Sequence, residues 1–179
     1  MLFRSDHVAQ VSDINIELSD ERDGLLDSAG GVIKALPKLG PAPFYLLNAD
    51  SFWIEGFKPN LLRLAEIWNP DEMDILLLLA GMSSAVGFSS KGDFHMDADG
   101  RLMRREEGEV APFAYAGAAI MKPSVFDNAP EGASSLNRQF DEALEKGRLF
   151  GLRLEGLWLH VGTPDAIREA EEAIARSAA

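Results

Sequence analysis

The feature that most constrains the fold is an apolar strand followed by a helix and a second apolar strand. Phe44–Asn48 is a short apolar run that ends in polar residues, and 74–80 is a second apolar run. Between them, Pro59 can begin a helix, and the spacing of apolar residues over 61–68 predicts one buried helical face. Apolar runs of this kind are typical of strands buried on both faces of a parallel sheet. The order therefore predicts a βαβ unit and a parallel sheet.

The remaining patterns predict further strands and helices around this unit. Alternation over 14–18 indicates a half-buried strand, and the segment 26–36 is a small-residue turn opening a short helix that ends before Pro37. The later elements are a hairpin over 95–104 around an Asp-Gly turn, a strand over 113–121, an amphipathic helix over 136–147, a strand pair over 150–154 and 157–161, and a last helix with Thr163 as its N-cap.

Length, charge and cysteine content exclude several classes of protein. The chain has 179 residues, a formal net charge of -12 and no cysteine, which excludes disulfides, thiolate zinc sites and cysteine nucleophiles. We expect one domain over 1–179, and no nucleic-acid partner because so acidic a chain repels phosphate backbones. No membrane partner, membrane span or signal peptide is visible, so we expect a cytoplasmic protein. The oligomeric state is left open.

Asp50 is the first candidate for chemistry, because it follows the carboxyl end of a predicted buried strand. In open α/β sheets, ligands bind in the crevice beyond that edge. A carboxylate there can hold Mg²⁺, a hard cation that prefers oxygen ligands. The alternative is that Asp50 only caps the segment that follows.

The segment from Leu26 to Gly31 is a second candidate. Two glycines at a helix start, Gly30 and Gly31, allow a ligand to approach the backbone closely, with free N–H groups pointing at it. A tight turn needs the same residues, so that alternative stays open. The segment matches neither a P-loop nor a dinucleotide-binding glycine pattern.

Three further residues lie at predicted strand ends or within strands. His160 can ligate a metal or move a proton, or it can simply pack and hydrogen-bond at a strand end. Asp93 could accept hydrogen bonds from sugar hydroxyls, and Gly117 inside a strand often marks the close approach of a ligand or of another backbone. A structural role is an equally good interpretation of Asp93 and Gly117.

Taken together, five blocks in order resemble the sugar-1-phosphate nucleotidyltransferases, in the branch of N-acetylmuramate-1-phosphate uridylyltransferases and mannose-1-phosphate guanylyltransferases. The resemblance covers nearly the whole chain from about Ile14 onward. The blocks are L-D-S-A-G-G at 26–31 with I-K-A-L after it, F-Y-L-L-N-A-D at 44–50, G-D-F at 92–94, Y-A-G at 115–117 and W-L-H-V-G-T at 158–163. The resemblance implies a Rossmann-like α/β fold with a mixed, mostly parallel sheet flanked by helices.

The resemblance also implies an activity and a set of site residues. The family transfers a nucleoside monophosphate from an NTP (here UTP or GTP) to a sugar 1-phosphate and releases pyrophosphate; UTP and N-acetylmuramate 1-phosphate are the expected pair, in cell-wall recycling. Asp50 and His160 would be catalytic and would bind the metal, which is Mg²⁺ or, as the second choice, Mn²⁺. The nucleotide-binding residues would be Ser28, Ala29, Gly30 and Asn48, and the sugar-binding residues Asp93 and Gly117.

The chain departs from the family's pattern at three places. His160 stands where the family usually has a metal-binding Asp, and Ala29 replaces a glycine. A glycine-rich, Arg-containing loop that grips the triphosphate has no counterpart, so we expect an N-terminally truncated, partial domain with little or no activity by itself. One alternative within the family is a mannose-1-phosphate guanylyltransferase, and another is a non-catalytic or regulatory paralogue that binds sugar phosphate or a partner subunit. A third alternative is an unrelated metal-dependent glycosyltransferase, for which Asn48-Ala49-Asp50 supplies only one carboxylate.

Overall fold

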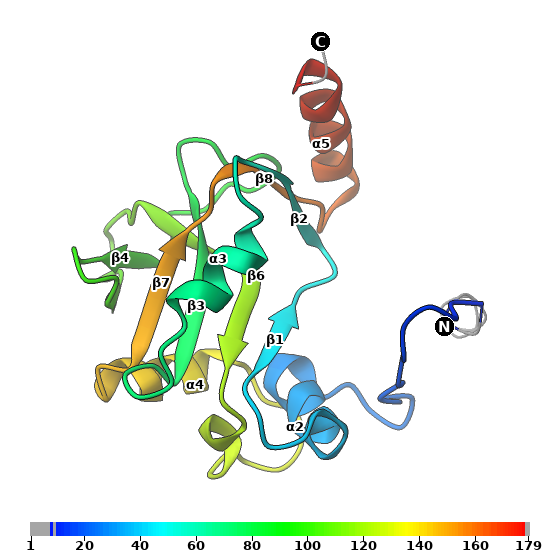
Figure 1. Cartoon of the computed structure of the whole chain (residues 1–179). Coiled ribbons are helices and arrows are strands. Elements are labelled where there is room, and N and C mark those ends of the chain that lie inside the picture. The colour runs from blue at the N-terminus through cyan, green and yellow to red at the C-terminus, as the bar shows by residue number, and fades with distance from the viewer. Residues whose placement is uncertain (1–7, 9, 178–179) are drawn as a thin grey trace. The chain divides into compact units, whose positions relative to one another are not determined.

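The computed structural model describes residue 8 and residues 10–177, and the chain divides into two compact units. One unit comprises the chain up to Gly40 together with Asn128–Leu136, and the other comprises Pro41–Asp127 and the chain from Asn137 onward. Figure 1 shows the elements of both. The expectation of one domain over the whole chain stays a prediction.

The first unit contains the helix α2 (Asp27–Leu39). The sequence predicted that this helix ends before Pro37, and this is wrong. Pro37 lies inside the helix, and the N–H of Gly40 donates to the carbonyl of Leu36, so the last turn closes despite the missing proline N–H. The strand expected over 14–18 is also wrong: the segment is irregular and the Ile14 side chain is 63% exposed, because alternation alone provides no partner strand.

The second unit contains the sheets and the remaining helices. Its strands are β1 (Phe44–Leu47), β2 (Ser51–Glu55), β3 (Ile75–Gly81), β4 (Phe94–Met96), β5 (Leu102–Arg104), β6 (Phe113–Met121), β7 (Leu149–Arg153) and β8 (Gly156–His160). Its helices are α3 (Asn60–Ile67), a short 3-10 helix (Pro123–Phe126), α4 (Asn137–Glu145) and α5 (Pro164–Ser177). No helix of the described residues is both long and apolar enough to cross a membrane.

The main sheet is mixed, and helices flank it, as expected. Its order is β5-β4-β6-β3-β7, and β1 also pairs with β6. The expected predominance of parallel pairing is wrong, because β3 and β7 are the parallel pair among the described strands of this sheet. The reason is β6, which pairs antiparallel with both β1 and β3 and so separates the two strands of the predicted βαβ unit.

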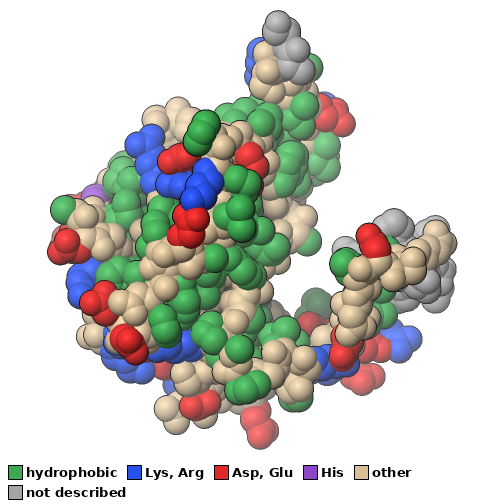
Figure 2. All heavy atoms as spheres, in the orientation of Figure 1, with side chains coloured by type: hydrophobic (Ala, Val, Ile, Leu, Met, Phe, Trp, Pro, Cys, Tyr) green, Lys and Arg blue, Asp and Glu red, His purple; other side chains and the backbone are tan. Residues whose placement is uncertain are grey.

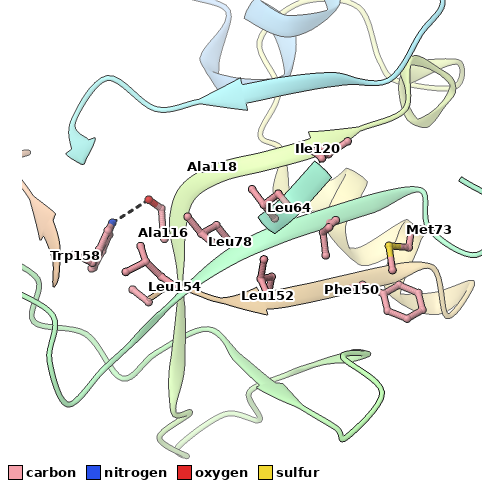
Figure 3. Close-up of a cluster of buried hydrophobic side chains, with 12 residues drawn as sticks. Leu64, Met73, Leu78, Ala116, Ala118, Ile120, Phe150, Leu152, Leu154 and Trp158 are labelled. Atoms are coloured by element: carbon pink, nitrogen blue, oxygen red, sulfur yellow. Dashed lines mark hydrogen bonds between the residues drawn. The ribbon is translucent and has the colours of Figure 1, made fainter. Parts of the chain in front are cut away.

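One face of the sheet packs against α3 and forms a hydrophobic core. Alternate residues of three strands point into it, as the strand period requires. The core comprises Leu64, Met73, Leu76, Leu78, Ala80, Ala116, Ala118, Ile120, Phe150, Leu152, Leu154 and Trp158. Figure 3 shows these side chains and the hydrogen bond from the Trp158 indole N–H to the carbonyl of Ala116, at 2.9 Å. This bond ties β8 to the centre of the main sheet.

The strands β2 and β8 form a separate two-stranded antiparallel sheet. The sequence predicted β8 as the partner of β7 and did not predict β2. The helix α5 packs on this small sheet through Ala170 and Ala173, which contact the buried Leu159. Thr163 caps α5 as predicted, because its hydroxyl accepts the N–H of Ala166 at 3.2 Å.

Candidate active site

Asp50 lies in the connection between β1 and β2, and backbone hydrogen bonds fasten this connection at both sides. The N–H of Asn48 donates to the carbonyl of Gly117 in β6, at 2.7 Å. The N–H of Val161 donates to the carbonyl of Asp50, at 2.8 Å. The Ser51 hydroxyl lies 3.4 Å from Oδ1 of Asp50, to which it can donate. The Asp50 carboxylate is therefore exposed on a backbone that β6 and the end of β8 hold in place.

His160 is the last residue of β8 and pairs with Ser51 of β2. Its ring stacks on Trp158, with centroids 5.9 Å apart and an angle of 17° between the planes. The Phe88 ring approaches it edge-on at 5.4 Å. Within the described part of the chain the imidazole makes no hydrogen bond, so its orientation comes from ring packing and its nitrogen atoms remain available to a ligand.

Gly162 is the point at which Asp50 and His160 converge. A Cβ added to Gly162 would lie 2.7 Å from Nε2 of His160 and 3.6 Å from Oδ2 of Asp50. A side chain there would displace the imidazole, since real Cβ atoms do not approach other atoms so closely. The glycine thus keeps open the small space that the carboxylate and the imidazole share.

Gly117 allows the connection after β1 to pack closely on β6. Its φ is +83°, and a Cβ there would lie 2.8 Å from the Ser51 hydroxyl and 3.1 Å from Cβ of Asn48. A cavity of about 350 Å³ opens beside these residues. Its lining is Leu47, Asn48, Ser51, Phe52, Trp53, Glu55, Leu61 and Gly117, which includes no lysine or arginine.

Asp93 lies just before β4 and fixes the N-terminal end of β6. Its Oδ2 accepts the N–H of Tyr115 at 2.9 Å, and its own N–H donates to the carbonyl of Phe113 at 2.7 Å. One carboxylate oxygen is therefore structural, and Oδ1 has no partner among the described residues. The Tyr115 hydroxyl is buried without a hydrogen-bond partner in that same part of the chain, and burial raises its pKa. The sugar-binding role of Asp93 stays a prediction.

The predicted nucleotide-binding residues Ser28, Ala29 and Gly30 lie in the first unit, at the beginning of α2. The N–H groups of Ala29 and Gly30 donate to the carbonyl of Ser134, at 2.8 and 3.3 Å, and the Ser28 hydroxyl accepts the N–H of Leu136. The expectation that these N–H groups are free for a ligand is wrong, because both already donate hydrogen bonds to the carbonyl of Ser134. Their role toward a nucleotide stays a prediction.

The donor set for a metal is small. In the described part of the chain, no group of three or more His, Asp or Glu side chains is placed to hold a metal ion. Asp50 and His160 offer one carboxylate and one imidazole. The carboxylate suits Mg²⁺, whereas the imidazole suits a transition metal such as Mn²⁺ better.

Ser51 and Gly162 belong to this arrangement, and sequence reasoning did not single them out. Ser51 begins β2, and the aromatic and β-branched run Phe52-Trp53-Ile54 was the available signal for a strand. Gly162 lies inside the W-L-H-V-G-T block. Its importance depends on the closeness of Asp50 in space, which a linear sequence does not reveal.

The chain is similar to curated uridylyltransferases along most of its length. It is 38% identical over 162 residues to the N-acetylmuramate alpha-1-phosphate uridylyltransferase of Caulobacter vibrioides, covering 90% of this chain and 67% of the relative. It is 29% identical over 159 residues to the enzyme of that name from Neisseria meningitidis serogroup B, covering 88% and 66%. The chain thus spans about two thirds of the length of these relatives. No family model matches it.

The fold is also found among solved structures. The inositol-1-phosphate CTP transferase from T. maritima superposes with a TM-score of 0.59 at 18% identity, covering 79% of this chain and 58% of that one. This similarity shows a shared fold. The Caulobacter relative, which is 38% identical and aligned over two thirds of its own length, shows that the present chain belongs to the sugar-1-phosphate nucleotidyltransferase family.

Proposed function

We propose that this chain forms the metal and sugar-phosphate side of a site that transfers a uridylyl group from UTP to N-acetylmuramate 1-phosphate. The observation that carries the proposal is the convergence of Asp50 and His160 at Gly162. The names of the two curated relatives support the choice of substrates. Because UTP is a cytoplasmic metabolite, we expect the reaction in the cytoplasm and its product in cell-wall recycling.

The reaction needs no covalent intermediate on the protein. An oxygen of the sugar phosphate forms a bond to the α-phosphorus of UTP, and the bond from that phosphorus to the oxygen of the departing pyrophosphate breaks. The protein mainly has to hold the two substrates in line and to offset their negative charge. A divalent cation, when bound, supplies charge neutralisation at the reacting phosphates.

Asp50 and His160 are the residues that would hold this cation. The donor chemistry fits one direct bond from the exposed Asp50 carboxylate, and one from the free imidazole nitrogen or through a water on it. The Ser51 hydroxyl would orient the carboxylate through the contact at Oδ1. We propose Mg²⁺ as the cation and Mn²⁺ as the ion that the imidazole favours.

The other predicted contacts belong to the same proposal. Asn48 and Gly117 line the cavity of about 350 Å³, where an amide side chain and an open backbone can meet substrate hydroxyls. Oδ1 of Asp93 is available to a sugar hydroxyl. We assign the base of the nucleotide to the α2 start, at Ser28, Ala29 and Gly30.

We also propose that the 179 residues alone transfer little or no uridylyl group. A triphosphate needs several cations around it, and the lining of the cavity beside Asn48 supplies none from the described residues. The remaining third of the relatives' length is where such cations would come from.

A test of the function uses two proteins, the chain itself and a chimera. In the chimera, the Caulobacter relative supplies the part of its own sequence that has no counterpart here. Pyrophosphate release is measured with N-acetylmuramate 1-phosphate, Mg²⁺ or Mn²⁺, and UTP, GTP or CTP in turn. We expect turnover by the chimera with UTP and almost none by the chain alone. A chimera that folds but uses GTP better, or no nucleotide at all, would contradict the assignment.

A further inference from the structure

A second cavity of about 370 Å³ lies where β3 and β7 end and β8 begins. Its lining comprises Arg63, Gly81, Ser84, Arg153, Leu154, Glu155, Gly156 and Trp158, and it shares no residue with the cavity beside Asn48. In Figure 2, basic side chains gather over the end of β7, with acidic ones next to them. Two arginines and one glutamate give this lining a net positive charge, although the whole chain has a formal net charge of -12.

Arg63 is the cation of this cavity that is already neutralised. Its Nη2 forms an ion pair with Oε1 of Glu155 at 3.1 Å, and its Nη1 donates to Oδ1 of Asn60 and to the carbonyl of Arg153, each at 2.9 Å. The Arg63 side chain is only 16% exposed. Arg63 therefore holds the backbone of Arg153 in position through the hydrogen bond to its carbonyl.

Asn60 holds the same loop through the backbone of Glu155. This fully buried residue accepts the N–H of Glu155 at 2.9 Å and donates to the carbonyl of Glu155 at 2.8 Å. It also donates to the carboxylate of Glu55. When buried polar groups make all of these hydrogen bonds, they hold a loop in one rigid conformation. The backbone at Arg153 is therefore preorganised in the absence of a ligand.

Arg153 is the cation that remains free. Its side chain is exposed, lines the cavity and makes no hydrogen bond or ion pair with another described residue. An unpaired guanidinium presents two parallel N–H groups that match the two oxygens of a carboxylate. The single free charge matches one carboxylate, while the nearby Glu155 carboxylate disfavours a more highly charged group such as a triphosphate.

The cavity is also connected to the candidate active site. Trp158 lines it, and the ring of Trp158 stacks on His160 at 5.9 Å. The two residues are two positions apart on β8, so their side chains lie on the same face of that strand. Trp158 therefore contacts both the imidazole and the cavity that Arg153 lines.

We propose that this cavity is an anion subsite in which Arg153 binds the carboxylate of the sugar substrate. The inference rests on the proposed function: N-acetylmuramate differs from N-acetylglucosamine by a lactyl ether that carries a carboxylate. Arg153 is then the residue that selects the acidic sugar, and Arg63 and Asn60 are positioning residues that hold its backbone. No chemical step takes place in the subsite.

The test is binding by the 179-residue chain, which needs no turnover. Dissociation constants for N-acetylmuramate 1-phosphate and N-acetylglucosamine 1-phosphate are measured by calorimetry with Mn²⁺ present. We expect the acidic sugar to bind about ten- to hundredfold more tightly, the range for a charge-assisted hydrogen bond. Arg153→Gln should abolish this difference by weakening the acidic sugar alone, and Arg153→Lys should restore part of it.

Arg176→Gln is the matched control, because Arg176 is 71% exposed near the end of α5 and should leave both constants unchanged. If the wild type binds the two sugars equally and Arg153→Gln changes neither dissociation constant, the subsite is overturned and the proposed function still stands. An equal loss for both sugars would overturn it too, because Arg153 would then bind the phosphate that both carry. Failure of both sugars to bind the wild-type chain would overturn the subsite together with the proposed function.

Discussion

The backbone N–H of Val161 donates to the carbonyl of Asp50 at 2.8 Å. This bond joins the chain after β1 to the chain after β8, which lie far apart in the sequence. Its effect is to place the Asp50 carboxylate beside the imidazole of His160, across Gly162. The candidate metal site therefore depends on backbone geometry as much as on its two proposed ligands.

Gly162→Ala should weaken the binding of metal and sugar phosphate without unfolding the chain. The added Cβ would lie 2.7 Å from Nε2 of His160, so the ring must rotate away from Asp50. We expect about a tenfold or greater loss in Mn²⁺ affinity, as for other changes that misorient a ligand. Gly24→Ala is the control, since nothing lies within 4 Å of a Cβ there. Unchanged Mn²⁺ affinity in Gly162→Ala would contradict the claim that Asp50 and His160 bind the metal in the space beside Gly162.

His160 should determine which cation the chain prefers. His160→Asp replaces a nitrogen donor with an oxygen donor, so Mg²⁺ should bind more tightly relative to Mn²⁺, by roughly tenfold. His160→Ala should lower the affinity for both ions. Titrations of each variant with each metal measure this. If both variants bind the metals as the wild type does, His160 has only the packing role seen in its contacts with Trp158 and Phe88.

Trp158→Phe should destabilise the second unit. The indole N–H donates to the buried carbonyl of Ala116, and phenylalanine leaves that carbonyl unpaired. The expected loss in the free energy of unfolding is about 1–3 kcal/mol, measured by urea denaturation. Trp68→Phe serves as the control, because that indole has no hydrogen bond to a described residue. Equal losses in the two variants would show that ring volume alone matters.

Asp74 should make stability depend on pH in the acid range. Burial alone would raise the pKa of its carboxyl, but hydrogen bonds from Lys122 and Arg148, both at 2.9 Å to Oδ1, outweigh burial and lower the pKa. A lowered folded-state pKa adds stability that is present above the unfolded value of about 3.9 and is lost as the pH falls through the folded-state pKa.

Asp74→Asn should therefore lower the free energy of unfolding at pH 7 by about 1–3 kcal/mol, the range for charged hydrogen bonds. The difference from the wild type should shrink as the pH falls below about 4. Urea denaturation at a series of pH values measures both, and Asp99→Asn provides an exposed aspartate without a side-chain partner in the described chain. A difference that stays constant down to pH 3 would refute the ion-pair explanation.

The sequence predicted individual strands and helices far better than it predicted which strands lie side by side. The apolar runs at Phe44–Leu47 and Ile75–Gly81 are both strands, with the helix α3 between them as predicted. Their separation by β6 could not be predicted, because β6 comes from Phe113–Met121, much later in the chain. The expected burial on both faces is confirmed for β3 and is wrong for β1, where Tyr45 and Leu47 are 43% and 53% exposed, because β6 is the one described strand that pairs with β1. An apolar run also carries no information about which strand lies beside it.

The candidate site shows the same limit. Asp50 and His160 were identified by residue type and by their place at strand ends, and the structure brings them together. The pairing of β8 with β2 was missed, because the strands β7 and β8 are adjacent in sequence and suggested a hairpin. Gly156 has a φ of +113° and lies at the start of β8, where the chain passes from the main sheet to the small one.

The most direct test of the account is the effect of Asp50→Asn on UTP-dependent pyrophosphate release by the chimera with N-acetylmuramate 1-phosphate. If Asp50 holds the cation that offsets the phosphate charge, turnover should fall by about a hundredfold or more while the unfolding free energy stays within about 1 kcal/mol of the parent. Asp99→Asn in the same protein should turn over normally. Full activity of Asp50→Asn at ordinary Mg²⁺ concentration would contradict the assignment of this site.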